Sequence, residues 1–170
     1  MIVPASPADV PALVHLINSA YRGEGSKQGW TTEADLIGGL RTDESHLTEI
    51  ITASDTIFLK YIDEADAIIG CVRLQKQGEK LYLGMLTVAP ALQAKGIGKQ
   101  LLQAADAYAK QENCRAIFMT VFSARPELIA WYERQGYHQT GEVVPFKPNT
   151  KFEVLMTDHL EFLVLEKNIV

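Results

Sequence analysis

Hydrophobic residues recur along this chain with two periods, and the changes of period mark the elements that it is expected to form. Spacings of three and four residues, or capping residues such as Ser6 and Thr32, predict helices. Alternating or continuous apolar runs between turn-like segments predict strands. The expected helices cover residues 6–21, 33–40, 43–53, 97–112 and 127–135. The expected strands cover residues 1–4, 56–62, 67–77, 80–88, 115–121, 137–144 and 151–167.

This order of elements predicts one α/β domain over residues 1–170, with a single mixed sheet of about seven strands flanked by about four helices. The early strands follow one another directly, so they are expected to pair antiparallel. The chain has 47% hydrophobic and 22% charged residues, which is typical of a globular protein. Low-complexity segments and linkers are absent from the sequence, which agrees with a single domain.

Composition argues against several classes of protein: membrane-spanning, secreted, metal-binding and nucleic-acid-binding. The apolar runs are shorter than a membrane span, and the first ten residues lack the features of a signal peptide, so neither is expected. Cys71 and Cys114 are the only two cysteines and are expected to be free thiols of a cytoplasmic protein. The four histidines are scattered, so no metal site is predicted. A net charge of -5 argues against nucleic-acid binding.

A polyanionic ligand of such an acidic chain needs a local binding feature, and residues 88–102 (VAPALQAKGIGKQLL) provide a candidate. A predicted strand ends at Val88, and a helix begins near two glycines. Unpaired N–H groups at a helix start attract phosphate, and glycine lets phosphate approach the backbone. Lys95 and Lys99 add positive charge. A tight turn with solvated lysines is the alternative interpretation.

Two familiar phosphate motifs do not fit this junction. A P-loop requires Ser or Thr after Gly-Lys, whereas Gln100 follows Gly98-Lys99. A dinucleotide-binding fold requires a third glycine, and Leu101 stands at that position. A nucleoside triphosphatase and a nicotinamide-dependent oxidoreductase are therefore disfavoured.

The segment QAKGIG at 93–98 resembles the Q/R-x-x-G-x-G/A signature of the GNAT superfamily of acyl-CoA-dependent N-acyltransferases. Residues 86–90 (LTVAP) resemble the end of that family's fourth strand, and 125–137 (RPELIAWYERQGY) resemble its helix-to-strand motif. The resemblance implies acetyl-CoA as cofactor. The residues that it assigns to cofactor binding are Leu86, Thr87, Val88, Gln93, Ala94, Lys95, Gly96, Ile97, Gly98, Lys99 and Arg125.

The same resemblance implies that Tyr132 protonates the departing coenzyme A thiolate, with a core aromatic residue as the alternative interpretation. Tyrosine, with a reference pKa of about 10, carries its proton at neutral pH and suits this role. Two positions depart from the family pattern. Arg125 stands where many members carry Asn, and Tyr82 stands where some carry a catalytic Glu. A general base, if one is used, must therefore come from another element.

The acceptor side is expected in the loop after the first helix. Residues 21–35 (YRGEGSKQGWTTEAD) combine glycines, aromatic residues and acids. Glu24 and Glu33 are candidates for holding an ammonium group or for acting as a base through water, and Trp30 for a pocket wall. Solvated side chains are the alternative. The last strands, with residues 162–165, are candidates for a homodimer contact.

These observations predict an N-acetyltransferase that moves an acetyl group from acetyl-CoA to a primary amine of a small molecule or peptide by direct attack. The missing carboxylate on the fourth strand favours an amine of low pKa. A noncatalytic acyl-CoA-binding or sensing module of the same fold is the alternative. Tyr132 discriminates between the two, because a binding module needs no proton donor.

Overall fold

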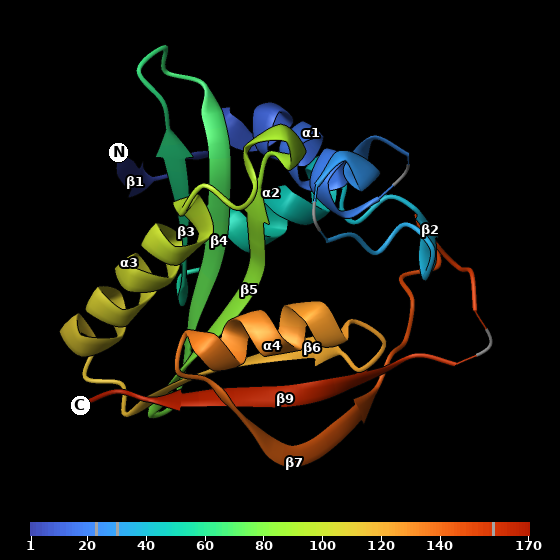
Figure 1. Cartoon of the computed structure of the whole chain (residues 1–170). Coiled ribbons are helices and arrows are strands. Elements are labelled where there is room, and N and C mark those ends of the chain that lie inside the picture. Colours follow the sequence, from blue (N-terminus) through green and yellow to red (C-terminus); the bar gives the residue numbers. More distant parts are fainter. Residues whose placement is uncertain (23, 30, 158) are drawn as a thin grey trace.

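A seven-stranded mixed sheet forms the centre of the computed structural model, with the strand order β1-β3-β4-β5-β6-β9-β7 (Figure 1). The structure describes residues 1–22, 24–29, 31–157 and 159–170. A separate two-stranded sheet pairs β2 with β8. The strands are β1 (Ile2–Pro4), β2 (Ile37–Gly39), β3 (Thr56–Ile62), β4 (Ile68–Gln77), β5 (Lys80–Val88), β6 (Ala116–Phe122), β7 (His138–Pro145), β8 (Glu153–Leu155) and β9 (Glu161–Asn168).

Four α-helices and three short 3-10 turns are described. The helices are α1 (Val10–Tyr21), α2 (Glu44–Thr52), α3 (Ile97–Gln111) and α4 (Pro126–Arg134), and the turns are η1 (Pro7–Asp9), η2 (Glu24–Gln28) and η3 (Pro90–Leu92). The prediction of a mixed sheet of about seven strands with about four helices is confirmed. None of the described helices is long and apolar enough to cross a membrane.

Helices cover both faces of the sheet (Figure 1), and an apolar core lies between the sheet and the helices on each face. The helices α3 and α4 pack on one face through residues such as Leu101 and Ile129. On the other face, α1 and α2 contribute Leu13 and Leu47, both fully buried. Burial of such side chains stabilises the fold by about 1.5–3 kcal/mol each. Each helix is therefore held by its apolar face against the strands that carry the site.

A β-bulge in β5 changes which core receives its side chains. Leu83 packs in the α3/α4 core, whereas Met85, two residues later, packs in the α1/α2 core. Met85 has a φ of +50°, and the β4–β5 register shifts beside it. The Met85 carbonyl accepts hydrogen bonds from Thr87 Oγ1 at 2.8 Å and Cys71 Sγ at 3.8 Å. These bonds fix the backbone just before the end of β5.

Two sequence predictions are wrong. Residues 33–40 were expected as a helix, but they form a turn followed by β2, because Gly38 and Gly39 are poor helix formers and Gly39 adopts a φ of +79°. Residues 151–167 were expected as one strand, but β8 and β9 belong to different sheets. The β2–β8 pairing joins residues more than a hundred positions apart, so no local pattern announces it.

The segment 162–165 lies inside the sheet, because β9 pairs with β6 on one side and β7 on the other. Val164 and Leu165 are buried within the chain itself. The homodimer remains a prediction, and a dimer contact would have to use other groups of these last strands.

Candidate functional site

A gap opens in the sheet where β5 and β6 diverge (Figure 1). The two strands run parallel and pair only over Lys80–Tyr82 and Ala116–Phe118. Beyond Tyr82, β5 continues along β4 while β6 continues along β9. The second half of β5 therefore presents a backbone edge that no strand covers, and an edge of this kind can pair with an extended ligand.

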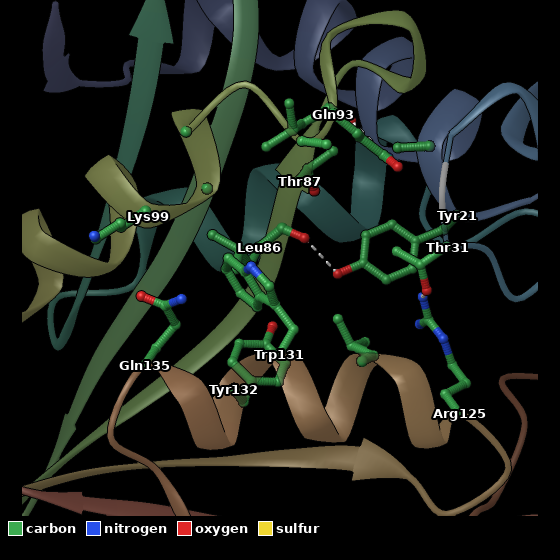
Figure 2. A pocket seen from close by; sticks show the side chains of 16 residues that line it. Tyr21, Thr31, Leu86, Thr87, Gln93, Lys99, Arg125, Trp131, Tyr132 and Gln135 are labelled. Carbon is green, nitrogen blue, oxygen red and sulfur yellow. Dashed lines mark hydrogen bonds between the residues drawn. The ribbon is translucent and has the colours of Figure 1, made fainter.

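Two side chains already form hydrogen bonds with this backbone edge. The Leu86 carbonyl accepts a hydrogen bond from the Tyr21 hydroxyl at 2.8 Å, and the Val88 carbonyl accepts one from Gln93 Nε2 at 3.2 Å (Figure 2). The N–H and carbonyl of a residue point to the same side of a strand. The Val88 N–H therefore points into the gap, and no acceptor for it exists among the described residues. It is a free donor at the end of β5.

The loop between β5 and α3 gathers more unpaired donors. Ala94 and Gly96 have φ values of +65° and +86°, and α3 begins directly after Gly96. Within the described structure, no acceptor exists for the backbone N–H groups of residues 93–99. Alternating left-handed residues before a helix N-terminus form a concave anion-binding backbone. An Ala at positive φ is strained, and such strain concentrates at functional sites.

The glycines fit a coenzyme A pyrophosphate at this loop. A Cβ placed on Gly96 would project into open space, so the approach to the backbone is clear. A Cβ on Gly98 would lie 3.3 Å from the Trp131 ring, so the α3 N-terminus packs closely on α4. Lys99 lines the same cavity, whereas Lys95 is exposed outside it and the Ile97 side chain belongs to the core.

Two cavities meet at this gap. The first has a volume of about 240 Å³ and lies between the Gly96 loop, the end of β5 and α4 (Figure 2). The second, of about 230 Å³, lies between the middle of β5, β6 and the β2/β8 region. The residues lining both cavities are Tyr21, Leu86, Arg125, Leu128 and Tyr132. These shared residues mark the place where two ligands would meet.

Tyr132 rises from α4 toward Leu86 at this meeting place (Figure 2). Only 6% of the residue is exposed, and its hydroxyl has no hydrogen-bond partner among the described residues. The Trp131 and Tyr137 rings pack edge-on against its ring at 5.1 and 5.9 Å. Burial raises the pKa of the Tyr132 hydroxyl well above its ordinary value, so the group stays protonated at neutral pH.

Arg125 takes part in a buried ion network. Its Nη1 donates to Glu33 Oε2 at 3.1 Å and its Nη2 donates to Thr31 Oγ1 at 2.7 Å. The other oxygen of Glu33 accepts from Arg22 Nε and Nη2 at 3.2 and 2.9 Å, and Arg22 also bonds Glu153 at 2.8 Å. We name these five residues the Glu33 network. It ties the segment after α1 to α4 and β8.

The network bears on two of the predicted site residues. The Arg125 guanidinium faces Glu33 and Thr31, and its buried Nε–H has no acceptor among the described atoms. The Glu33 carboxylate accepts three hydrogen bonds from two guanidinium groups, so both of its oxygens are already engaged within the protein. Trp30 lies outside the described residues, and so does the side chain of Glu24.

The sequence interpretation missed six residues that line the first cavity: Ala20, Tyr21, Thr31, Leu128, Trp131 and Gln135. A signal for α4 was present, because positions 128, 131, 132 and 135 follow the i, i+3, i+4, i+7 spacing of one helix face. The hydroxyl of Tyr21 reaches a strand 65 residues away, and sequence spacing gives no hint of that contact.

Comparison with known proteins agrees with this geometry. A family model described as "Acetyltransferase (GNAT) family" matches residues 12–137. That match covers most of the chain, so the chain belongs to the GNAT acetyltransferase family. The uncharacterized protein YdhI of Bacillus subtilis is 29% identical over 76 residues, which are 45% of this chain and 46% of that protein. The chain thus matches under half the length of this curated relative.

Solved structures share the fold at low identity. The ribosomal-protein-S18-alanine N-acetyltransferase of Escherichia coli superposes with a TM-score of 0.73 at 14% identity, over 99% of this chain and 93% of that chain. A phosphinothricin acetyltransferase from Sinorhizobium meliloti, in complex with acetyl-CoA, superposes with a TM-score of 0.71 at 17% identity, over 99% and 88%. At these identities the likeness establishes the fold alone.

Proposed function

We propose that this chain transfers an acetyl group from acetyl-CoA to a primary amine of a small molecule or peptide by direct attack. One observation carries the proposal: the unpartnered hydroxyl of Tyr132 lies where the two cavities meet, beside the free edge of β5. The first cavity would hold the cofactor and the second would hold the acceptor. Among its neighbours in fold, one enzyme is named for a ribosomal-protein alanine and one for phosphinothricin, so peptide and small-molecule acceptors both stay open.

The residues that would hold the cofactor lie along the first cavity. The N–H groups of residues 93–99 and the start of α3 would bind its pyrophosphate, with Lys99 adding charge. Leu86 and Val88 would pair with its extended arm along the uncovered edge of β5, and Thr87, whose backbone faces β4, would line the cavity between them. The bound cofactor supplies an activated acetyl group as a thioester. Arg125 would contribute indirectly, because its guanidinium is committed to Glu33 and Thr31.

The chain's own groups supply two catalytic effects. The free N–H of Val88 would donate to the thioester oxygen as negative charge develops there, which stabilises the transition state. The Tyr132 hydroxyl would donate its proton to the departing sulfur. The amine nitrogen forms the new bond to the acetyl carbon as the carbon–sulfur bond breaks. The proton that the amine loses can then restore the tyrosine.

The raised pKa of Tyr132 sets a limit on this step. A thiol titrates near 8.5 and an ordinary tyrosine near 10, so a completed transfer to free thiolate would be unfavourable by about 2 kcal/mol. Burial raises the tyrosine pKa further and increases that cost. Tyr132 is therefore expected to act by hydrogen-bonding the sulfur while the bond breaks, with the proton passing in concert with deprotonation of the amine.

The amine must be neutral when it attacks. A lysine-like amine of pKa 10.4 is neutral in roughly one molecule in 2,500 at pH 7, a cost of about 4.6 kcal/mol, whereas an amine of pKa 8 costs about 1.4 kcal/mol. Among the described residues, both glutamates lining the second cavity are bonded to arginine. We therefore propose an acceptor amine of low pKa that needs little help from a base. Glu24, Trp30 and Glu33 stay proposed as the acceptor-side residues.

Replacing Tyr132 with phenylalanine tests the proposal. The variant keeps the ring packing and loses the proton donor, so turnover should fall about 100-fold or more while the acetyl-CoA Kd changes less than about threefold. Tyr108→Phe, on α3 outside both cavities, is the matched control and should keep full turnover. Unchanged turnover in Tyr132→Phe would reject the acid role. Acetyl-CoA binding without thiol release from any amine would favour the noncatalytic binding module.

A further inference from the structure

Arg41 lines the second cavity without an ion-pair partner among the described residues. The ionisable arginine and glutamate residues lining this cavity are Arg22, Arg41, Arg125, Glu33 and Glu153. All of these except Arg41 bond to one another in the Glu33 network. No carboxylate lies within ion-pair distance of the Arg41 guanidinium among the described residues. A half-buried guanidinium without a counter-charge is costly unless a ligand supplies one.

Arg41 is held close to the meeting place of the two cavities. Its backbone N–H donates to Asn18 Oδ1 at 2.8 Å, which fixes the start of the side chain. Its guanidinium carbon lies 5.6 Å from the centroid of the Tyr21 ring. The hydroxyl of that same ring bonds the Leu86 carbonyl on the free edge of β5. An anion bound by Arg41 would therefore be separated from the free edge of β5 by the ring of Tyr21 alone.

A second arginine increases the positive potential. The guanidinium of Arg73 lies 5.5 Å from the ring centroid of Tyr82, which lines the cavity. Its Nη2 donates to Oε1 of the neutral Gln75 at 3.2 Å. A carboxylate is not found within ion-pair distance of Arg73 anywhere in the described chain. The surroundings of this cavity therefore favour an anion although the whole chain is acidic.

The other wall of the second cavity is apolar. Phe122 stacks on Phe162 with ring centroids 4.4 Å apart, and Phe146 packs edge-on against both at 5.0 and 5.6 Å. All three phenylalanines line the cavity, together with Leu83 and Met119. Such a wall suits an aliphatic or aromatic body of the acceptor.

We propose that the acceptor is an apolar amino acid, whose carboxylate pairs with Arg41 and whose side chain packs on the phenylalanine wall. This inference rests on the proposed function and names its substrate class. The carboxylate keeps the amine of a free amino acid basic, and pairing with Arg41 would offset that charge, so the bound amine would have the low pKa proposed above. A guanidinium matches a carboxylate in geometry and in charge. A polyamine fits poorly, because the described carboxylates of the cavity are already bonded to arginine and the remaining charge is positive.

Matched acceptors test the proposal. We would measure thiol release from acetyl-CoA with leucine and leucinamide, with phenylalanine and phenylalaninamide, and with spermidine. The amide lacks only the carboxylate charge, and its amino group is less basic, so simple availability of neutral amine favours the amide. The wild-type kcat/KM is expected to be roughly 10- to 100-fold higher for the amino acid.

Variants of Arg41 separate recognition from structure. Arg41→Gln should raise the KM for the amino acid roughly 10- to 100-fold and leave the amide and the acetyl-CoA Kd within about threefold. Arg41→Lys should recover part of the loss, since it keeps the charge but not the planar fork. Arg115→Gln, whose partner Glu79 lies on the surface far from both cavities, is the control and should behave as wild type.

Three results would overturn the inference. An amide as good as its amino acid in the wild type would show that the carboxylate is not recognised. An equal loss for both acceptors in Arg41→Gln would make Arg41 a purely structural residue. Acetylation of spermidine without that of either amino acid would refute the substrate class while leaving the proposed function intact. Failure of every amine, with acetyl-CoA bound, would refute both together.

Discussion

The Glu33 network should stabilise the acceptor side of the site. Replacing Arg125 with methionine measures its contribution to the free energy of unfolding. The change removes the bonds to Glu33 and Thr31, at 3.1 and 2.7 Å, and replaces the guanidinium by an apolar group of similar length. Removing one partner of a buried ion pair typically costs about 3–5 kcal/mol. Glu33 keeps both bonds to Arg22, so the expected loss of unfolding free energy is smaller, about 2–4 kcal/mol.

Glu33→Gln perturbs the same network from its centre. This change removes the negative charge that lies between two guanidinium groups, whose side chains are only 3% and 7% exposed. Arg22 keeps Glu153, whereas Arg125 retains only Thr31. We expect a loss of about 3–5 kcal/mol, at least as large as that of Arg125→Met.

Urea unfolding of the two single variants and the double variant gives a double-mutant cycle for the free energy of unfolding. Because the two side chains bond directly, the double variant should be more stable than the sum of the single losses predicts, by about 1–3 kcal/mol. The exposed Arg115–Glu79 pair is the control cycle and should give about 1 kcal/mol or less. Losses of Arg125→Met and Glu33→Gln that add within about 0.5 kcal/mol would refute the network as a coupled unit.

Two further predictions concern the cofactor loop and alkaline pH. Gly96→Val should weaken acetyl-CoA binding at least tenfold in calorimetry. The control is Gly78→Val, at a φ of +60° in a distant turn with equally open space, which should lose stability without losing affinity. Equal affinity losses in the two variants would count against cofactor binding by the Gly96 loop. Burial raises the pKa of Tyr21 to about 12. The folded state therefore holds this proton more tightly than the unfolded state, and stability should fall as pH rises from about 10 to 12, by at most about 2–3 kcal/mol from this group. Urea unfolding across that range should show a shallower fall in Tyr21→Phe, and an identical fall would contradict the assignment.

Local pattern predicted the parts of the molecule that depend on local chemistry. Apart from β2, the strands up to Val88, the helix after Gly96 and the glycine junction each carry their signal within about fifteen residues. The structure adds that Gly96 is left-handed, a conformation that glycine adopts without strain. The family resemblance added the role of Tyr132, which spacing alone leaves as one of several aromatic residues on a helix face.

Long-range contacts account for what the sequence could not predict. Arg125 and Glu33 are 92 residues apart, and only the fold brings them within 3.1 Å. The family resemblance therefore placed Arg125 beside the cofactor and the composition of residues 21–35 placed Glu33 beside the acceptor, without the bond that joins them. The strand β2 needs a partner from the far end of the chain, so the local pattern of residues 37–39 does not predict it.

Acetyl transfer by this chain is best tested by calorimetric titration with acetyl-CoA, followed by thiol release over a panel of amines. We expect saturable binding of one acetyl-CoA per chain, and thiol release that depends on both an added amine and the Tyr132 hydroxyl. An absence of acetyl-CoA binding would contradict it, because the unpaired donors of residues 93–99 and the free edge of β5 would then serve some other ligand.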